Sequence, residues 1–502
     1  MPTITSSSPF HSLSLSLSTL FLITPLLLFS SSPPLLPTSS LPPLMKSTSD
    51  SPSPISSLEL DFPTLKPPTS LSLPPTPFFY EPTSVLDPNL TSHDSHLTSS
   101  WDFPETDWSF LLPDPQNPDY TLPPPPPLFD LSHLDLLLSA ASAIDSGDLP
   151  SAHSILARLN HLFPSISGPP LHRSSLLFKD SLSSLLSSPS PPLSPSPIDL
   201  VRRISAHKSL SDLSPIPQFT SFTANQTLLE SLSTSSSIHL IDFDLSLGGQ
   251  WSSFAQEIAA RSRSSRSPPP SLRLTAILSD DSPDSSLAAD NLRDFARSLG
   301  LRFSIDLVRV ASLGTFALSS VRLSTADSTG VVLSPAIFRA IGSDPASSAD
   351  LLRFIRRTSP RSVVFVDTEP CSSSSSSPSS PPSFKRAIAS GIEFYSSMLD
   401  SLDSAALATG LGDDPVRRIE RFLIRPRVTS WVQACGAHPT SWRETLASAG
   451  FSPAPFSEFT ESQAEWLLRR APVDGFHVAR RDGAMVLSWK GRDLAATSAW
   501  RC

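Results

Sequence analysis

The segment Ile238–Trp251, with the sequence IHLIDFDLSLGGQW, carries the clearest structural signal in the chain. Its first residues form a short apolar run, which is typical of a buried strand and too short for a helix. Asp242 and Asp244 follow where that strand should end, and Gly248 and Gly249 then provide a flexible turn. The residues after the turn have the apolar spacing of a helix. These features predict the first unit of a doubly wound α/β sheet, in which ligands bind at the carboxyl ends of the strands.

Strand and helix patterns alternate along the rest of the chain. Further short apolar runs predict strands at Leu272–Leu278, Arg302–Val308, Val331–Leu333 and Ser362–Asp367. Helical spacing recurs among and after them, at Leu287–Leu299, Asp350–Arg357 and Phe384–Leu402. Near the end, Asp482 and Gly483 separate two alternating runs, which predicts an antiparallel hairpin. We therefore predict an α/β, Rossmann-like fold of the class I methyltransferase type, with a mostly parallel sheet and a terminal antiparallel hairpin.

The sequence before the central unit divides into two parts. Residues 1–127 are rich in Ser and Pro. Such a segment cannot offset its ordering entropy by burial, so we predict that it is disordered. Within it, Trp101–Tyr120 interleaves aromatic and acidic residues, a composition that fits both an activation segment and a solvated linker. From Leu128 onward the apolar spacing predicts an N-terminal α-helical cap.

The first helix of this cap contains LDLLL, which matches the LxxLL pattern of helices that dock in a groove. Leu134, Leu137 and Leu138 are therefore candidate partner-binding residues. The same leucines would serve equally well in the core of a helix bundle, and leucines at helical spacing are usually buried.

Charge and cysteine content exclude several classes of protein. Residues 1–127 hold two lysines against eleven acidic residues and so carry the whole formal net charge of −9. The remaining residues balance, so bulk electrostatic binding of nucleic acid is not expected. Three widely spaced cysteines offer no disulfide framework, which suits a reducing compartment. The apolar run Leu20–Phe29 has no preceding basic residue and is too short to span a bilayer, so we predict a soluble intracellular protein without a membrane contact.

Several blocks of the sequence resemble the plant GRAS family of transcriptional regulators. Ile238, His239, Leu240, Ile241 and Asp242 resemble its VHIID motif, and the continuation to Gly248, Gly249, Gln250 and Trp251 resembles its HAIRY MERISTEM, or scarecrow-like, branch. The other matching blocks are ILARLNH at Ile155–His161, PIPQFTSFTANQTLLESL at Pro215–Leu232, RRIERF at Arg417–Phe422 and the terminal SAW motif at Ser498, Ala499 and Trp500. Five ordered blocks make the resemblance specific.

The resemblance implies a single GRAS domain over residues 128–502. The regions that it implies are leucine-rich repeat I at 128–190, the VHIID region at 207–272, leucine-rich repeat II at 282–314, the PFYRE region at 323–424 and the SAW region at 427–502. The PFYRE motif itself is not spelled out in this sequence. The residues that correspond to it by resemblance are Pro370, Phe394–Tyr395 and Arg417–Phe422.

The resemblance also implies what the protein does. It implies a nuclear regulator or co-regulator of transcription that works through protein–protein interactions in meristem maintenance and plant development. WUSCHEL-type homeodomain proteins are the implied partners, together with other GRAS domains in homo- or heterodimers. DNA would be contacted directly or through a partner, and no cofactor is implied.

The fold by itself raises the alternative of an S-adenosylmethionine-dependent methyltransferase. Such an enzyme needs glycines directly after the first strand, so that the backbone can approach the cofactor. Here Asp244 and Ser246 occupy two of those glycine positions, and only Gly248 coincides with a glycine of the cofactor-binding pattern. The sequence has no HExxH motif and no paired Cys and His, so we predict no catalytic and no metal-binding residues. We predict instead that Asp242 and Asp244 accept hydrogen bonds from the N-terminus of the next helix, and that His239 is a satisfied core residue.

A second alternative is sequence-specific DNA binding. Arg417, Arg421 and Arg425 recur every four residues, so a helix would display them as a basic stripe. Such a stripe can bind phosphates, or it can pair with local acidic side chains on a solvated face. No helix-turn-helix, zinc-finger or basic-zipper signature accompanies it.

Overall fold

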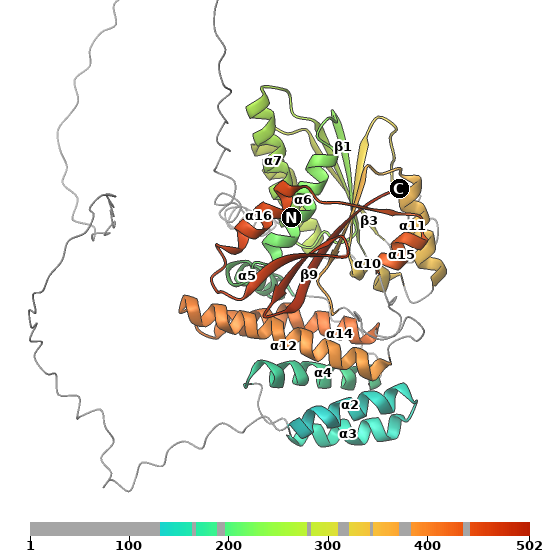
Figure 1. The fold of residues 1–502 in the computed structure, drawn as a ribbon, viewed down its shortest axis with the longest axis vertical. Helices are drawn as coiled ribbons and strands as arrows, with labels where there is room; N and C mark the ends of the chain where they lie inside the picture. Colours follow the sequence, from blue (N-terminus) through green and yellow to red (C-terminus); the bar gives the residue numbers. More distant parts are fainter. Residues whose placement is uncertain are drawn as a thin grey trace, which may run out of the picture. The chain divides into compact units, whose positions relative to one another are not determined.

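The described part of this computed structural model has helices packed on both faces of one sheet (Figure 1). The described residues are 131–162, 167–187, 196–278, 283–309, 321–341, 345–370, 383–434 and 442–502. The segment predicted to be disordered, including Trp101–Tyr120 and the apolar run Leu20–Phe29, lies outside them. Within these ranges, no helix has the length and apolar character needed to cross a membrane.

The elements follow the predicted order of helical cap, α/β alternation and terminal strands. The helices before the central unit are α2 (Leu131–Asp145), α3 (Leu149–Leu162), α4 (Pro170–Leu186), α5 (Pro197–Leu213) and α6 (Ile216–Ser231). The alternating part contains β1 (Ser237–Asp242), α7 (Gly249–Ser265), β2 (Ser271–Leu278), α8 (Pro283–Ser298), β3 (Phe303–Arg309), β4 (Ser328–Leu333), α10 (Pro335–Ala340), α11 (Pro345–Arg357), β5 (Ser362–Asp367) and α12 (Phe384–Thr409). The last part contains α13 (Asp414–Ile419), η3 (Glu420–Ile424), α14 (Arg425–Gln433), α15 (Trp442–Ser448), β6 (Ser452–Ala454), α16 (Glu458–Leu468), β7 (Phe476–Arg481), β8 (Ala484–Trp489) and β9 (Arg492–Arg501).

The strands form one sheet in the order β3-β2-β1-β4-β5-β9-β8-β7, and β6 pairs with β9. The strands from β3 to β5 are parallel, with β1 between β2 and β4. Beyond β5 every pairing is antiparallel. This topology confirms the predicted Rossmann-like sheet of the class I methyltransferase type. The central segment Ile238–Trp251 therefore begins in the middle of the sheet and ends on the first helix beside it.

The terminal hairpin is present, and one strand beside it was missed. Arg481 pairs with Ala484 across the turn. Asp482 and Gly483 both have positive φ, at 51° and 77°, as a two-residue hairpin turn requires. However, β9 rather than the hairpin pairs directly with β5. The sequence of β9, RDLAATSAWR, is poor in the β-branched and aromatic residues that mark strands, so its neighbours rather than its own propensity place it.

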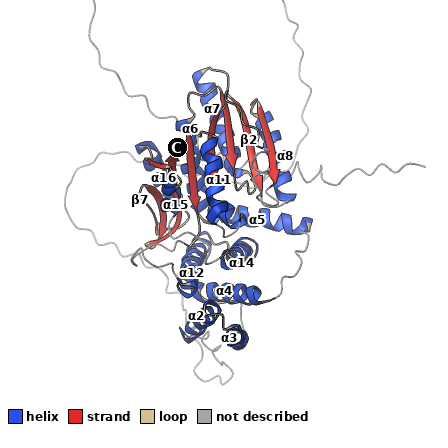
Figure 2. Cartoon of the chain, turned by 90° about the vertical axis from the view of Figure 1, so that its right-hand side faces the viewer, coloured by secondary structure: helices blue, strands red, loops and turns tan. Residues whose placement is uncertain are grey.

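Both faces of the sheet are covered (Figure 2). Side chains alternate along β1. Ile238 and Leu240 pack against α6, α7 and α8. Ile241 packs in the cluster on the other face, to which α10, α11 and α15 contribute.

The helical cap shares a core with the rest of the domain. Helix α4 packs on both α12 and α14, and α2 packs on α3 and α12. One apolar cluster runs from α2, α3 and α4 through α12 and α14 to β8 and β9. The cap is thus continuous with the α/β part and is not a separate folding unit within the described residues.

The segment VRRIERFLIRPRV is helical, but a π-helical turn, η3, interrupts it. Proline has no N–H to donate, and its ring collides with the carbonyl of the residue four positions earlier. Pro426 lies at the start of α14. The wider turn over Glu420–Ile424 removes this collision and lets the helix continue.

Candidate functional site at the carboxyl edge of the sheet

Asp242 and Trp251 join the end of β1 to the first turn of α7. The Trp251 indole Nε1 donates a hydrogen bond of 2.6 Å to Asp242 Oδ2, and the amide of Asp244 donates one of 3.0 Å to Oδ1. Both side chains are buried, with 2% and 3% of their surfaces exposed. Asp242 therefore accepts a hydrogen bond from the N-terminal turn of the next helix, as the sequence predicted. The donor in that turn is the Trp251 side chain, and the amide of Asp244 between strand and helix is the second donor.

The turn between β1 and α7 depends on Gly248. Its φ is 75°, and a Cβ built there would lie 2.9 Å from Leu292 Cδ1. Ser246 has a φ of 47°, a left-handed conformation that glycine adopts at lower cost. A bulkier residue thus stands where a cofactor-binding turn would have glycine. Gly249, in contrast, begins the helix with no heavy atom within 4 Å of the position that a Cβ would take.

His239 is the satisfied core histidine that the sequence predicted. It has no exposed surface. Its Nε2 lies 2.8 Å from Thr275 Oγ1, and Arg273 Nη2 lies 3.2 Å from its Nδ1. Because Arg273 can only donate, Nδ1 accepts and Nε2 carries the proton. Burial, helped by the charge of Arg273, lowers the pKa of His239 to about 4, so the ring is neutral at physiological pH.

Polar side chains from β4, α10 and β5 surround Asp244, which is exposed. Ser334, directly after β4, donates to Asp244 Oδ2 at 3.5 Å. Arg339 of α10 forms an ion pair with Glu369, which follows β5. The backbone amide of Glu369 in turn donates to Asp367 Oδ1 at 3.0 Å. These groups were not predicted because they come from separate segments, although their position directly after a parallel strand was a signal that could have identified Asp367 and Glu369.

Burial raises the pKa values of two carboxyl groups at this edge. Desolvation raises the pKa of Asp242 to about 7, against the opposing effect of the hydrogen bond from Trp251. Desolvation and the neighbouring charge of Glu369 raise the pKa of Asp367 to about 7. Both groups therefore bind protons more tightly in the folded chain than in the unfolded chain.

The raised pKa of Asp242 predicts a pH-dependent contribution to stability. The folded-state pKa of about 7 lies above the unfolded value, so the contribution is fully present below about pH 4 and is lost as the pH rises through about 7. The lowered pKa of His239 gives its contribution to stability the opposite pH dependence, so wild type must be compared with Asp242→Asn, in which His239 is retained. In urea denaturation, the unfolding free energy of wild type should fall relative to that of Asp242→Asn as the pH rises from 5 to 8. A difference that stays constant over this range would contradict the prediction.

The chemistry available at this edge is that of hydrogen bonding and ion pairing. No nucleophile with an adjacent base lies among the residues described above. In the described ranges, no three His, Cys, Asp or Glu side chains are placed to hold a metal ion. A cofactor enzyme of this fold places an acid after the second strand to bind the ribose hydroxyls. Asp280 and Asp281, which follow β2 in the sequence, lie outside the described residues.

The candidate partner-binding leucines of the cap divide into two groups. Leu137 is fully buried in the core, which agrees with the core interpretation of this position and removes it from the binding surface. Leu134 and Leu138 are partly buried against the same core. Of the SAW motif, Ala499 and Trp500 are buried at 1% and 2% exposure, and the Trp500 indole Nε1 donates to Ser498 Oγ at 2.9 Å.

The basic stripe is largely neutralised by local acidic groups. Arg417 pairs with Asp413 at 3.3 Å, and Arg425 pairs with Asp180 of α4 at 2.7 Å. Arg421 is exposed and lies over the ring of Phe422. This arrangement is the one expected of a solvated helix face with ion pairs.

Comparison with known proteins identifies the family. The model of the GRAS domain family matches residues 133–501. Scarecrow-like protein 15 of Arabidopsis thaliana is 38% identical over 375 residues, which cover 73% of this chain and 74% of that protein. Scarecrow-like protein 6 of the same plant is 35% identical over 373 residues, which cover 73% of this chain but only 62% of that protein.

A solved structure supports the fold. The crystal structure of SCL7 of Oryza sativa aligns with a TM-score of 0.56 and 24% sequence identity, over 74% of this chain and 99% of that one. Taken with the motifs and the sheet topology, these matches show that the chain belongs to the GRAS domain family of scarecrow-like transcriptional regulators and is not an enzyme.

Proposed function

We propose that this chain acts in the nucleus as an adaptor that regulates transcription by holding protein partners, in meristem maintenance and plant development. WUSCHEL-type homeodomain proteins and other GRAS domains are the proposed partners. The single observation that carries the proposal is the modified turn after β1. There a hydrogen bond from Trp251 to Asp242 links strand and helix, and Ser246 adopts a left-handed conformation at a position where a cofactor enzyme needs glycine.

The proposed docking surface is the outer part of the cap. Among the described elements, helix α3 packs mainly on α2 and α4, and it lies at the margin of the domain (Figure 1). Leu149, at the start of α3, is 47% exposed. Leu134 and Leu138 are partly exposed on α2. Exposed and half-exposed leucines on helices are suited to a partner that offers an apolar groove.

A pull-down with the full chain tests this surface. The variant Leu134→Ala/Leu138→Ala/Leu149→Ala should capture a WUSCHEL-type homeodomain protein at least about tenfold less well than wild type, since a loss of about 1.4 kcal/mol already gives that factor. Leu407→Ala is the control, because Leu407 is 85% exposed and lies on α12 instead of the cap. Equal capture by the triple variant and the control, with both melting as folded proteins, would remove the cap surface from the proposal.

Deletion of the whole cap is not a suitable test. Helix α4 contributes nine buried residues and packs on α12 and α14. Its removal would expose the core and unfold the domain, so partner capture would be lost whether or not the cap is the docking surface.

A further inference from the structure

Asp244 lies in a recess at the boundary between β1 and β4. The helix after β1 packs on one face of the sheet and the helices after β4 pack on the other. In open α/β sheets, ligands bind where the connections diverge in this way. Asp244 is exposed, yet desolvation by the surrounding protein is the largest influence on its pKa and raises it. A side chain that water can reach, but that protein desolvates, lines a recess and not a convex surface.

Tyr395 of α12 faces the same recess from the inside. Helices α12 and α14 lie beyond the carboxyl ends of the parallel strands (Figure 2). Burial raises the pKa of the Tyr395 hydroxyl, and the charges of Arg427, Glu369 and Arg339 also act on it. The same three charges act on the carboxyl group of Asp244. Because such effects require proximity, these groups are neighbours. We call Asp244, Asp367, Glu369, Arg339, Tyr395 and Arg427 the polar recess.

Two buried groups of the polar recess have no hydrogen-bond partner among the described residues. One is the hydroxyl of Tyr395, a side chain with no exposed surface. The other is Nε of Arg339, whose side chain is 11% exposed and whose Nη1 pairs with Glu369. A buried polar group without a partner costs free energy, and native structures contain few of them. Two such groups at one place indicate a partner that the chain itself does not supply.

The charges and donors of the polar recess select the class of that partner. Its three carboxyl groups outnumber its two guanidinium groups, so they disfavour a further anion. A cation cannot accept a hydrogen bond from Nε of Arg339, and within the described ranges the acidic side chains are not placed to hold a metal ion. A neutral hydroxyl group both donates and accepts. It can therefore accept from Arg339 or Tyr395 and donate to a carboxylate.

We propose that the polar recess binds a small uncharged molecule with neighbouring hydroxyl groups, of the sugar or polyol class. Arg339 Nε and the Tyr395 hydroxyl donate to its oxygen atoms. Arg427, which is exposed, donates further hydrogen bonds, and Asp244 accepts from its hydroxyl groups. The inference goes beyond the adaptor role, which requires no small molecule.

Saturation-transfer NMR with the full chain and four neutral polyols tests the proposal. Glycerol, D-glucose, sucrose and myo-inositol are the probes, and at least one should receive saturation and give a dissociation constant by titration. Arg427→Gln should weaken this binding at least about tenfold, the usual effect of losing a hydrogen bond to a charged group. Arg421→Gln is the control. Arg421 is also exposed and lies over the ring of Phe422, so its loss should leave the dissociation constant unchanged.

Tyr395→Phe is the sharper variant, because it removes only the unpartnered hydroxyl. It should weaken polyol binding about two- to tenfold, as the loss of one neutral hydrogen bond does. The free variant should melt at or above the wild-type temperature, since a buried group without a partner has been removed. A clearly lower melting temperature would show that the hydroxyl has a structural partner and would contradict the proposal.

Other outcomes also overturn the proposal. If none of the four polyols receives saturation, or if Tyr395→Phe and Arg427→Gln both bind like wild type, the polar recess is not the site. Sodium acetate or methylammonium chloride that binds in place of the polyols, and is lost in the two variants, would assign the recess to a charged ligand. Partner capture depends on the cap leucines and not on these residues, so failure of one proposal is distinguishable from failure of the other.

Discussion

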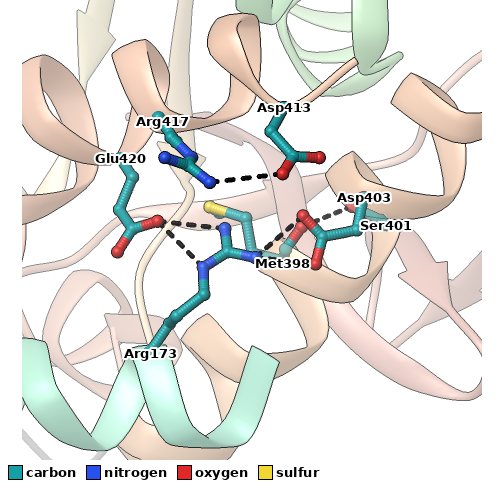
Figure 3. A network of polar contacts seen from close by, with 7 residues as sticks. All are labelled: Arg173, Met398, Ser401, Asp403, Asp413, Arg417 and Glu420. Atoms are coloured by element: carbon teal, nitrogen blue, oxygen red, sulfur yellow. Dashed lines mark hydrogen bonds and ion pairs between the residues drawn. The ribbon is translucent and has the colours of Figure 1, made fainter. Parts of the chain in front are cut away.

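The Arg173→Met variant is expected to unfold with a free energy about 3–5 kcal/mol lower than that of wild type, the usual cost of leaving a buried charge without its partner. Arg173 lies on α4 with 9% of its surface exposed. Its Nη1 donates to both carboxylate oxygens of Asp403 at 2.9 and 2.7 Å, and its Nε donates to Glu420 Oε2 at 3.0 Å (Figure 3). The Glu420 side chain is only 9% exposed, so most of the loss comes from that carboxylate.

The same figure contains the matched control. Arg417 and Asp413 also form an ion pair (Figure 3), but their side chains are 63% and 81% exposed. Arg417→Met should therefore change the unfolding free energy by less than about 1 kcal/mol. Both variants can be compared with wild type by urea denaturation at one pH.

A double variant distinguishes two causes of the lost stability: the missing contacts of Arg173 and the buried carboxylate left without a partner. Arg173→Met/Glu420→Gln removes both charges and should recover much of the stability lost in Arg173→Met. If the double variant is as unstable as the single one, the packing of the Arg173 side chain carries the effect. A loss below about 1 kcal/mol in Arg173→Met would show that the network contributes little to folding.

This network gives a structural role to part of RRIERF, the motif whose arginines were candidates for DNA binding. Glu420 is the acidic residue of this motif and lies in the π-helical turn, where it bonds to Arg173 of the cap. Arg173 and Glu420 are separated by 247 residues, so no local pattern could have paired them. The motif therefore joins the cap to the α/β part of the domain.

Local patterns predicted well what local forces determine. The strands β1, β2, β4 and β5 were found because each is a short apolar run that is largely buried. The edge strand β3 was found from its alternating pattern, although most of its residues are exposed or half-buried. The hairpin was found because Asp482 and Gly483 suit a turn with two positive φ angles. In the candidate site, Asp242 and Trp251 were singled out because both lie in the segment Ile238–Trp251, although the hydrogen bond between them was not predicted.

Tertiary neighbours determine what the sequence missed. Strand β9 carries mainly small and polar residues, and β5 and β8 on either side define it. The pair Arg339–Glu369 depends on which strands are adjacent, because Arg339 lies on the helix after β4 and Glu369 follows β5. The two residues come from segments that no sequence spacing connects.

The second large effect is expected at Trp251. Trp251→Ala should lower the unfolding free energy by about 3–5 kcal/mol, because the indole is buried among Phe254 and the other residues between β1 and α7. Trp251→Phe keeps an aromatic ring and leaves Asp242 Oδ2 without its donor, at a cost of about 1–3 kcal/mol. Trp466→Phe is the control, because Trp466 is half-buried and stacks on Arg470 at 4.0 Å, and it should cost less than about 1 kcal/mol.

A double-mutant cycle shows whether the bond between Trp251 and Asp242 holds the turn. If it does, Trp251→Phe will cost less in an Asp242→Asn background than in wild type, with a coupling energy of about 0.5–3 kcal/mol. The hydrogen bond from Trp251 lowers the pKa of Asp242, so its loss should also strengthen the pH dependence of stability that this carboxyl group causes. Equal costs in both backgrounds, with an unchanged pH dependence, would mean that packing alone positions Trp251. The indole would then be one more core residue, and the turn after β1 would owe its shape to Gly248.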